Sequence, residues 1–276
     1  MFTLNCRGRM LTIDKPIVMG VINITPDSFF SGSRIQDKEA ISQAVKKMLS
    51  EGATVVDIGG QSTRPGSEKV SVDEEMKRVI PAIEFIIKKN SSALISIDTY
   101  QSKIAKEAVE AGASIVNDIS AGEMDAQMLS TVAGLKVPYV CMHMKGTPQS
   151  MQRDPTYENV TMEVLDFFIR KIDDCKQAGI NDVIVDPGFG FGKTFTHNFQ
   201  LLKNLKAFKM LDRPILAGLS RKSTIYKTLG ITPEEALNGT TVLNTLALQN
   251  GANILRVHDV KEACEAVKLF GKYSAA

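Results

Sequence analysis

Residues 17–29 read IVMGVINITPDSF. The first seven form a continuous apolar run that is rich in β-branched residues and too short for an independent helix, which predicts a strand buried on both faces. The run ends at Asn23, and Pro26 then stops the strand, so that Asp27 and Phe29 follow in a loop near its exit. In α/β enzymes, the carboxyl ends of buried parallel strands carry the chemistry. This stretch therefore predicts such an enzyme, with further polar residues at the other strand ends.

Short apolar runs and helical stripes alternate along the rest of the chain. Seven more strands are expected at residues 54–58, 94–98, 114–118, 137–143, 182–186, 214–218 and 252–257. Helices are expected after them and after the first strand, at 38–50, from 71 onward, at 102–111, 125–133, up to 178, and at 198–210, 233–249 and 260–270. Eight strands, each followed by a helix, predict an α/β fold of the (β/α)8 TIM barrel type. A doubly wound open sheet is the alternative, but the count of eight argues against it.

A shorter piece precedes the first barrel strand. Residues 2–6 and 10–13 have strand character and flank a turn at residues 7–9, which predicts an N-terminal β-hairpin able to close the bottom of the barrel. The length of 276 residues suits one barrel, although two smaller domains would also fit it. We expect a single domain that spans residues 1–276.

Composition excludes several classes of function. The net charge of +2 comes from 33 basic and 31 acidic residues spread along the chain, so no basic tract indicates nucleic-acid binding. No apolar run resembles a signal peptide or a membrane span, and we expect a cytoplasmic protein with no membrane partner. The cysteines lack the spacing of a metal site and are expected to be reduced structural thiols, at Cys6, Cys141, Cys175 and Cys264.

Polar residues close nearly all of the expected strands. In chain order they are Asn23, Asp57, Asp98, Asn117, His143, Asp186, Ser220 with Lys222, and Arg256 with His258. Any one of them taken alone is more often a satisfied structural group than a ligand. The stability of a barrel, however, does not require polar residues at nearly every end on one rim. The rim is therefore predicted to be a binding site.

Two kinds of chemical group occur at this rim. Asp98, Asn117 and Asp186 supply acceptors, which suit a planar heterocycle with several N–H groups, because a carboxylate can accept two parallel hydrogen bonds. Donors for anionic oxygens are available at Arg64, Lys222, Arg256 and His258. Asn23 could add a contact to Mg²⁺, which commonly bridges a phosphate and one or two protein oxygens. We therefore expect a flat nitrogen heterocycle at one end of the site and a phosphate or pyrophosphate at the other.

A glycine-rich stretch at residues 188–194, GFGFGKT, invites a nucleotide-binding interpretation. That interpretation fails, because Pro187 stands where a Walker loop needs glycine and the spacing is not that of the dinucleotide fingerprint. A tight loop that lets the backbone approach a ligand is the better prediction. The sequence also lacks a Ser-His-Asp arrangement and a His/Cys metal cluster.

Seven blocks of sequence resemble those of the dihydropteroate synthase family. They are MGVINITPDSF at 19–29, DIGGQSTRPG at 57–66, IDT at 97–99, VNDI at 116–119, DPGFGFGKT at 186–194, SRKS at 220–223 and RVHD at 256–259. The resemblance implies a barrel enzyme of folate biosynthesis, usually a homodimer and a target of sulfonamides. Members of this family transfer a pterinylmethyl group: they condense 6-hydroxymethyl-7,8-dihydropterin pyrophosphate with p-aminobenzoate.

The resemblance also implies roles for individual residues. The pterin would be held by Asp98, Asn117, Asp186 and Lys222, between apolar walls formed by Ile119, Met142 and Phe191. Pyrophosphate would be bound by Arg64, Arg256, His258 and Asn23, the last together with Mg²⁺. The p-aminobenzoate would be surrounded by Phe29, Thr63, Pro65, Lys222 and Ser223. Catalysis would depend on Arg64, Lys222, Arg256, His258 and Asp27, with Asp27 on a mobile first loop.

The sequence departs from the family pattern at Gln61, where glutamate is usual, and at residues 30–33, which read FSGS. These differences affect the contacts of the first loop rather than the reaction. Two other functions fit a pterin-binding barrel: a pterin-dependent methyltransferase domain and a catalytically silent pterin-binding partner. The predicted cationic clamp, which a methyltransferase does not need, and the presence of both loop sequences count against them.

Overall fold

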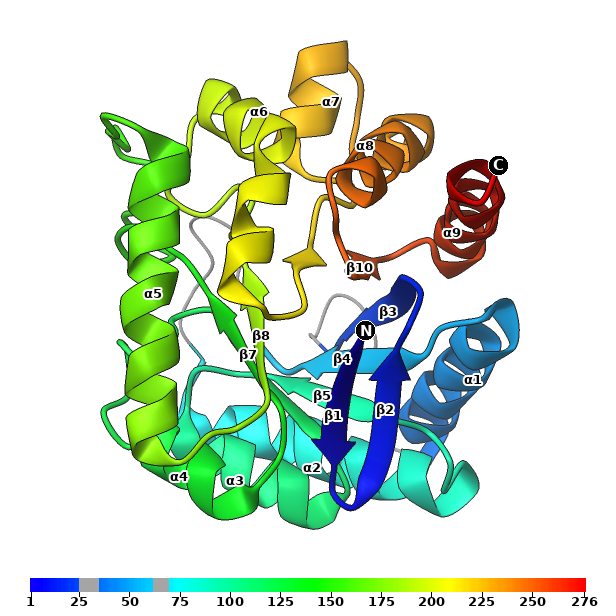
Figure 1. Ribbon diagram of the computed structural model, residues 1–276. Coiled ribbons are helices and arrows are strands. Elements are labelled where there is room, and N and C mark those ends of the chain that lie inside the picture. Colours follow the sequence, from blue (N-terminus) through cyan, green and yellow to red (C-terminus); the bar gives the residue numbers. More distant parts are fainter. Residues whose placement is uncertain (25–34, 62–69) are drawn as a thin grey trace.

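Eight parallel strands form one sheet in the order β8-β7-β6-β5-β4-β3-β10-β9 (Figure 1). The structure is a computed structural model and describes residues 1–24, 35–61 and 70–276. The strands are β3 (Ile17–Asn23), β4 (Val55–Gly59), β5 (Ile95–Asp98), β6 (Ile115–Asp118), β7 (Tyr139–Met142), β8 (Val183–Asp186), β9 (Leu216–Ala217) and β10 (Ile254–Val257). A parallel bridge between Val185 and Ile215 joins the two ends of this order. The sheet therefore closes, and the predicted (β/α)8 barrel is confirmed.

Helices surround the barrel (Figure 1). They are α1 (Ile35–Glu51), α2 (Val72–Lys89), α3 (Ser102–Ala111), α4 (Met128–Leu135), α5 (Val160–Ala178), α6 (Phe195–Lys203), the 3-10 helix η1 (Leu205–Leu211), α7 (Ser223–Leu229), α8 (Leu237–Gln249) and α9 (Val260–Ser274). In α2, Val79, Ala82, Ile83 and Ile86 are buried at helical spacing and form the stripe that faces the sheet. Ser71 accepts a hydrogen bond from the backbone N–H of Glu74 and so begins this helix.

Two helical regions differ from the sequence prediction. The helix expected at 198–210 begins at Phe195 and passes into η1, because the side chain of Thr194 accepts from the backbone N–H of His197 and caps an earlier start. Helix α7 was not predicted. It has only seven residues and ends at Gly230, whose φ of +68° favours glycine, so it carries too short a pattern to recognise.

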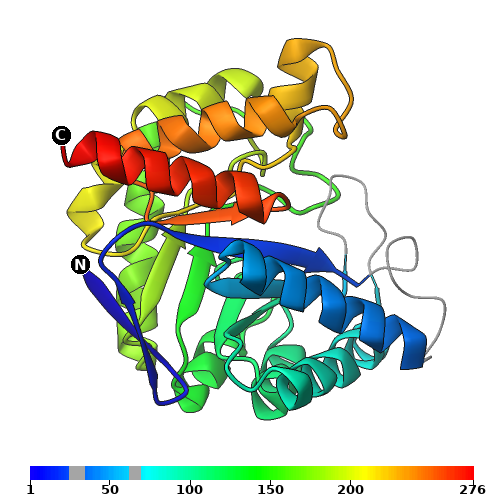
Figure 2. The same ribbon diagram turned by 90° about the vertical axis from the view of Figure 1, so that its right-hand side faces the viewer.

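The N-terminal hairpin closes the end of the barrel at which the strands begin (Figure 2). Strands β1 (Phe2–Cys6) and β2 (Arg9–Ile13) pair antiparallel, as predicted. Hairpin side chains pack in one apolar cluster with residues at the start of the barrel strands, namely Leu4, Cys6, Leu11 and Ile13 with Ile17, Val55, Leu94, Ile115, Val140, Ile184, Leu216 and Ile254. This end is therefore filled with apolar side chains, and the polar strand ends lie on the opposite rim.

Two predictions from composition can be compared with the described residues. All four cysteines are buried and unpaired, as expected. Among the helices that the structure describes, none is long and apolar enough to cross a membrane.

Candidate active site

Strand register brings the predicted acceptors together. Asp98 at the end of β5 lies opposite Asn117 of β6, and Met142 at the end of β7 lies opposite Asp186 of β8. One pocket is lined by Asp98, Asn117, Ile119, Met142, Asp186, Phe191, Gly218, Lys222 and Arg256. It contains every residue for which the sequence resemblance implied a contact to the pterin. Arg256, predicted to bind the pyrophosphate, lines the same pocket.

A buried hydrogen-bond network connects four of the strands at the base of this pocket, β4, β5, β6 and β10. The guanidinium of Arg256 donates from Nε to Asp57 Oδ2 at 2.7 Å and from Nη2 to Asp98 Oδ2 at 2.6 Å. The side chain of Asn117 donates from Nδ2 to the same oxygen of Asp57 at 2.9 Å. Asp57 was predicted to lie at a strand end but was not assigned a role in binding the pterin. The feature of the sequence that could have indicated this role is that Asp57 is the single carboxylate in an otherwise apolar strand.

Burial shifts the ionisation of these groups. It raises the pKa of Asp98 to about 7, although the charge of Arg256 opposes the shift and that of Asp57 adds to it. Burial also raises the pKa of Asp186, against the charge of Lys222, and lowers the pKa of Lys222 to about 8. Burial disfavours the charged form of Arg256. The negative charges of Asp57 and Asp98 favour that form more strongly, so the pKa of Arg256 is raised. The charge of the pocket therefore changes near neutral pH.

A pH dependence of ligand binding follows from these shifts. Asp98 accepts two hydrogen bonds only when it is deprotonated, so affinity for the pterin alcohol should rise as the pH passes about 7. Affinity should fall again above about pH 8, where Lys222 loses its charge. Calorimetric titrations from acid to alkaline pH should therefore show a maximum between these two values.

Two variants assign the limbs of that profile. Asp98→Asn should remove the acid limb, and Lys222→Met should remove the alkaline limb. An alkaline limb that persists in Lys222→Met would belong to the ligand, and a flat profile in the unaltered chain would contradict the prediction.

Lys193 stabilises the glycine-rich loop that follows β8 by hydrogen bonds to its backbone carbonyls. Its buried amino group donates to Gly188 O at 3.1 Å and Phe191 O at 3.0 Å, and lies 2.8 Å from His143 Nδ1. Burial lowers the pKa of Lys193 well below its ordinary value, and burial beside this lysine lowers the pKa of His143 to about 2. Lys193 therefore holds loop carbonyls and a neutral imidazole, which agrees with the prediction that this is not a phosphate loop. Phe191 belongs to this loop. The Nζ atom of Lys222 lies over its ring, 4.8 Å from the ring centre.

His258 and Asn23, predicted to bind the anion, and Ser223, predicted to contact p-aminobenzoate, lie on the same rim. His258 is exposed, and its Nδ1 lies 3.0 Å from Ser220 Oγ, which also accepts from the His258 backbone N–H at 3.2 Å. Asn23 is half-buried at the end of β3, and Ser223 begins α7 directly after Lys222. The structure thus places these residues on the rim that carries the acceptor pocket.

Comparisons with known proteins agree with this geometry. Residues 19–258 match the family model described as pterin binding enzyme. The dihydropteroate synthase of Escherichia coli K12 is 43% identical, over 95% of this chain and 93% of that one. The chain belongs to the dihydropteroate synthase family. Two solved members superpose on essentially the whole chain at 39% identity: the Yersinia pestis enzyme with a sulfonamide drug, at a TM-score of 0.93 over 100% of both chains, and the Xanthomonas albilineans enzyme with 7,8-dihydropteroate, at 0.89 over 99% of both.

Dihydropteroate synthase is a transferase of folate synthesis. It condenses 6-hydroxymethyl-7,8-dihydropterin pyrophosphate with p-aminobenzoate to 7,8-dihydropteroate and releases pyrophosphate. This is the reaction of the chain, and the function predicted from the sequence is confirmed.

Several predicted dihydropteroate synthase residues lie outside the described ranges. They are Asp27, Phe29, Thr63, Arg64 and Pro65, which belong to the two signature loops. Gln61, the departure from the family pattern, is described and buried, and its Nε2 donates to Tyr100 OH at 3.0 Å. Its amide is therefore held by a neighbouring side chain of the barrel.

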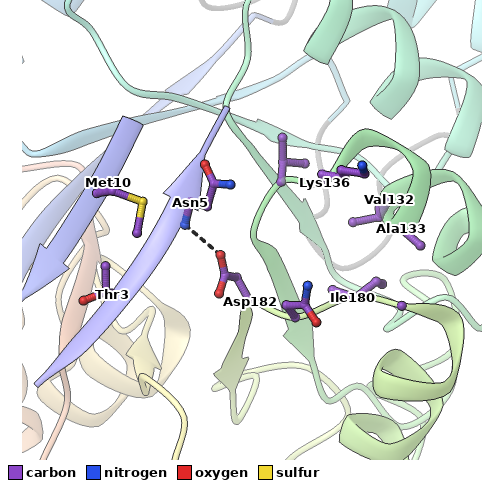
Figure 3. Close-up of a pocket in the computed structure, with 11 residues that line it drawn as sticks. Thr3, Asn5, Met10, Val132, Ala133, Lys136, Ile180 and Asp182 are labelled. Atoms are coloured by element: carbon purple, nitrogen blue, oxygen red, sulfur yellow. Dashed lines mark hydrogen bonds between the residues drawn. The ribbon is translucent and has the colours of Figure 1, made fainter. Parts of the chain in front are cut away.

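A larger hollow of about 450 Å³ lies at the opposite end of the dihydropteroate synthase barrel (Figure 3). The hairpin contributes Thr3, Asn5 and Met10 to one side of it, and Lys136 and Asp182 line the other. The backbone N–H of Asn5 donates to Asp182 Oδ2 at 2.7 Å across the hollow. Among the predicted site residues that the structure describes, none lines this hollow, so its larger volume does not make it the candidate active site.

Proposed function

We propose that the pocket at the carboxyl ends of the strands is where dihydropteroate synthesis takes place, with the pterin ring held by Asp98, Asn117 and Asp186. The observation that most supports this role is an unsatisfied acceptor. Asp98 Oδ1 is buried and has no hydrogen-bond partner among the described residues, although Asp98 lines the pocket. A buried carboxylate oxygen without a donor is costly, so a ligand that brings N–H groups gains from filling it.

The apolar walls suit the faces of the same ring. Ile119 and Met142 belong to a small apolar cluster at the rim, and Phe191 packs against it. A flat ring placed between these side chains would lie with its edge towards the acceptors. Lys222, which donates to Phe189 O and lies in the same pocket, would provide a donor to a ring oxygen.

Arg256 and His258, together with Arg64, would bind the pyrophosphate at the mouth of this pocket. No group of three or more His, Cys, Asp or Glu side chains within residues 1–24, 35–61 and 70–276 could hold a metal ion. Mg²⁺ nevertheless suits the oxygen of Asn23, since this ion commonly takes few protein ligands and completes its coordination with phosphate and water. When bound there, it would offset the negative charge of the departing pyrophosphate.

The reaction can proceed by ionisation. The C–O bond to pyrophosphate breaks, and the electron-rich dihydropterin ring delocalises the positive charge left on the exocyclic carbon. Arg256, His258 and Arg64 stabilise the leaving group, while the buried carboxylates face the cationic ring. The neutral amine of p-aminobenzoate, held by Phe29, Thr63, Pro65 and Ser223, attacks the carbon and then loses a proton. A strong base is not required, because an aniline is already nucleophilic.

An assay of pyrophosphate release tests this proposal. Release from the pterin pyrophosphate should depend on added p-aminobenzoate, and labelled p-aminobenzoate should appear in dihydropteroate. A methyltransferase would leave the pyrophosphate ester intact, and a silent binding protein would bind the pterin without release. Either outcome would contradict the proposal.

Asp27 provides a prediction about rate. We expect its carboxylate to stabilise the charge that develops on the pterin, so Asp27→Ala should lower kcat and kcat/KM together by about 10²-fold. Binding of the pterin alcohol should stay nearly unchanged. If Asp27 only caps its own turn, the variant will instead show a lower melting temperature and near-normal kcat.

We further propose that residues 1–276 form one domain and that two copies associate through the last helices. Large apolar side chains are exposed there at helical spacing, Val242 and Leu246 on α8 and Leu269 and Tyr273 on α9. Sedimentation should detect a dimer that Leu269→Asp weakens. The matched variant Met210→Asp, which changes an exposed residue of η1, should not weaken it. A monomer, or equal effects of both variants, would contradict this interface.

A further inference from the structure

Asp57 lies beneath the acceptor pocket and does not line it. It is fully buried in β4, two residues before the strand ends at Gly59. Gly59 is opposite Asp98 in the sheet, so Asp57 occupies the next inward layer below the acceptors. From there its Oδ2 accepts hydrogen bonds from Asn117 on β6 and Arg256 on β10. One carboxylate oxygen therefore connects two residues of the pocket.

The bond to Asp57 determines which end of the Asn117 amide is available. A side-chain amide has a donor nitrogen and an acceptor oxygen, whereas a carboxylate paired with a guanidinium can only accept. Asn117 must therefore turn its nitrogen towards Asp57. Its oxygen is left for the pocket that Asn117 lines, where it adds a third acceptor to those of Asp98 and Asp186.

The same carboxylate restrains Arg256. Its Nη2 lies 2.7 Å from Asp57 Oδ2 as well as 2.6 Å from Asp98 Oδ2, so the guanidinium is shared between two carboxylates. Without Asp57, the guanidinium would turn fully to Asp98 and compete with a ligand for it. Fold stability alone is a weak reason for such a charge, because well-packed apolar residues often replace a buried ion pair without loss.

We propose that Asp57 is a positioning residue for the pterin: it orients Asn117 as an acceptor, and it shares Arg256 with Asp98 so that Asp98 Oδ1 stays available to the ligand. This role rests on the proposed function of the pocket. The pterin bears several N–H donors along one edge, and three acceptors in fixed orientation would match that edge. Asp57 would act on the ligand only through its two partners.

An exchange of the two side chains tests the proposal. Asp57→Asn should weaken binding of 6-hydroxymethylpterin by about 10-fold or more, because Asn117 can then present either end of its amide. In the double variant Asp57→Asn/Asn117→Asp, the amide at position 57 can donate to a carboxylate at position 117, which again offers only acceptors to the ligand. Affinity should return to within about threefold of the unaltered chain, as expected for coupled partners.

The double variant also decides the question if Asp57→Asn alone does not fold. If Asp57 acts only through its charge at its own position, the exchanged pair will bind the pterin at least as poorly as the single variant or fail to bind it. That result would overturn the proposal. An affinity loss in Asp57→Asn that merely follows its melting temperature, with no recovery in the double variant, would overturn it as well.

Asp118→Asn is the matched control. Asp118 is an equally buried carboxylate beside Asn117, but it accepts from Tyr139 OH and Ser120 and does not bond to the pocket residues. It should lower the melting temperature and leave pterin affinity within about threefold. Failure of the unaltered chain to bind 6-hydroxymethylpterin would count against the proposed function, whereas failure of the exchange alone would count against the role of Asp57.

Discussion

Arg256→Met is expected to lower kcat/KM by about 10³-fold or more. The variant loses a cation for the pyrophosphate and leaves Asp57 and Asp98 buried without their shared partner. Because Arg256 holds down the pKa of Asp98, its removal should raise that pKa further, so Asp98 would be protonated at neutral pH and accept fewer hydrogen bonds. Steady-state kinetics with the pterin pyrophosphate measures the loss.

The acid limb of pterin binding separates these two effects. In Arg256→Met it should move to higher pH, whereas loss of anion binding alone would leave it in place. Arg256→Lys keeps a positive charge but lacks the fork that reaches both carboxylates, so we expect an intermediate kcat/KM. Near-normal kcat/KM in the methionine variant, with a melting temperature that shows a folded protein, would contradict the assignment.

Asp186→Ala is expected to weaken binding of the pterin alcohol by about 2 kcal/mol or more, roughly 30-fold. Asp186 has two roles at the pocket. It lines the cavity as an acceptor, and its Oδ1 accepts from the Gly188 backbone N–H at 2.8 Å, which shapes the loop that carries Phe191. The substitution should therefore remove a ligand contact and loosen one apolar wall. Calorimetry with 6-hydroxymethylpterin measures the change.

Asp182→Ala is a suitable control, because Asp182 directly precedes β8 and Asp186 ends the same strand. Its carboxylate accepts from the Asn5 backbone N–H and anchors the hairpin, at the end of the barrel that is closed by apolar side chains. We expect a modest loss of stability and no change in pterin affinity. If both alanine variants weaken the pterin to the same extent, the effect is one of fold stability and Asp186 is not a ligand.

The sequence by itself determined the barrel and the rim that carries the site. Eight apolar runs alternating with helical stripes require parallel strands covered by helices, and parallel strands place all their carboxyl ends on one rim. For that reason Asp98, Asn117 and Asp186 could be brought together from strand ends alone. Helix α7 was missed, because seven residues carry too short a periodic pattern.

Only the tertiary structure decided how the side chains of that rim pair. Sequence order does not indicate that Asp57 of β4 bonds to Asn117 of β6 and to Arg256 of β10, since both contacts cross the interior of the closed barrel. It likewise does not reveal that Lys193 supports this loop by donating to the carbonyl oxygen of Phe191. Strand ends follow from local periodicity, whereas hydrogen-bond partners depend on barrel closure and on which inward layer each side chain occupies.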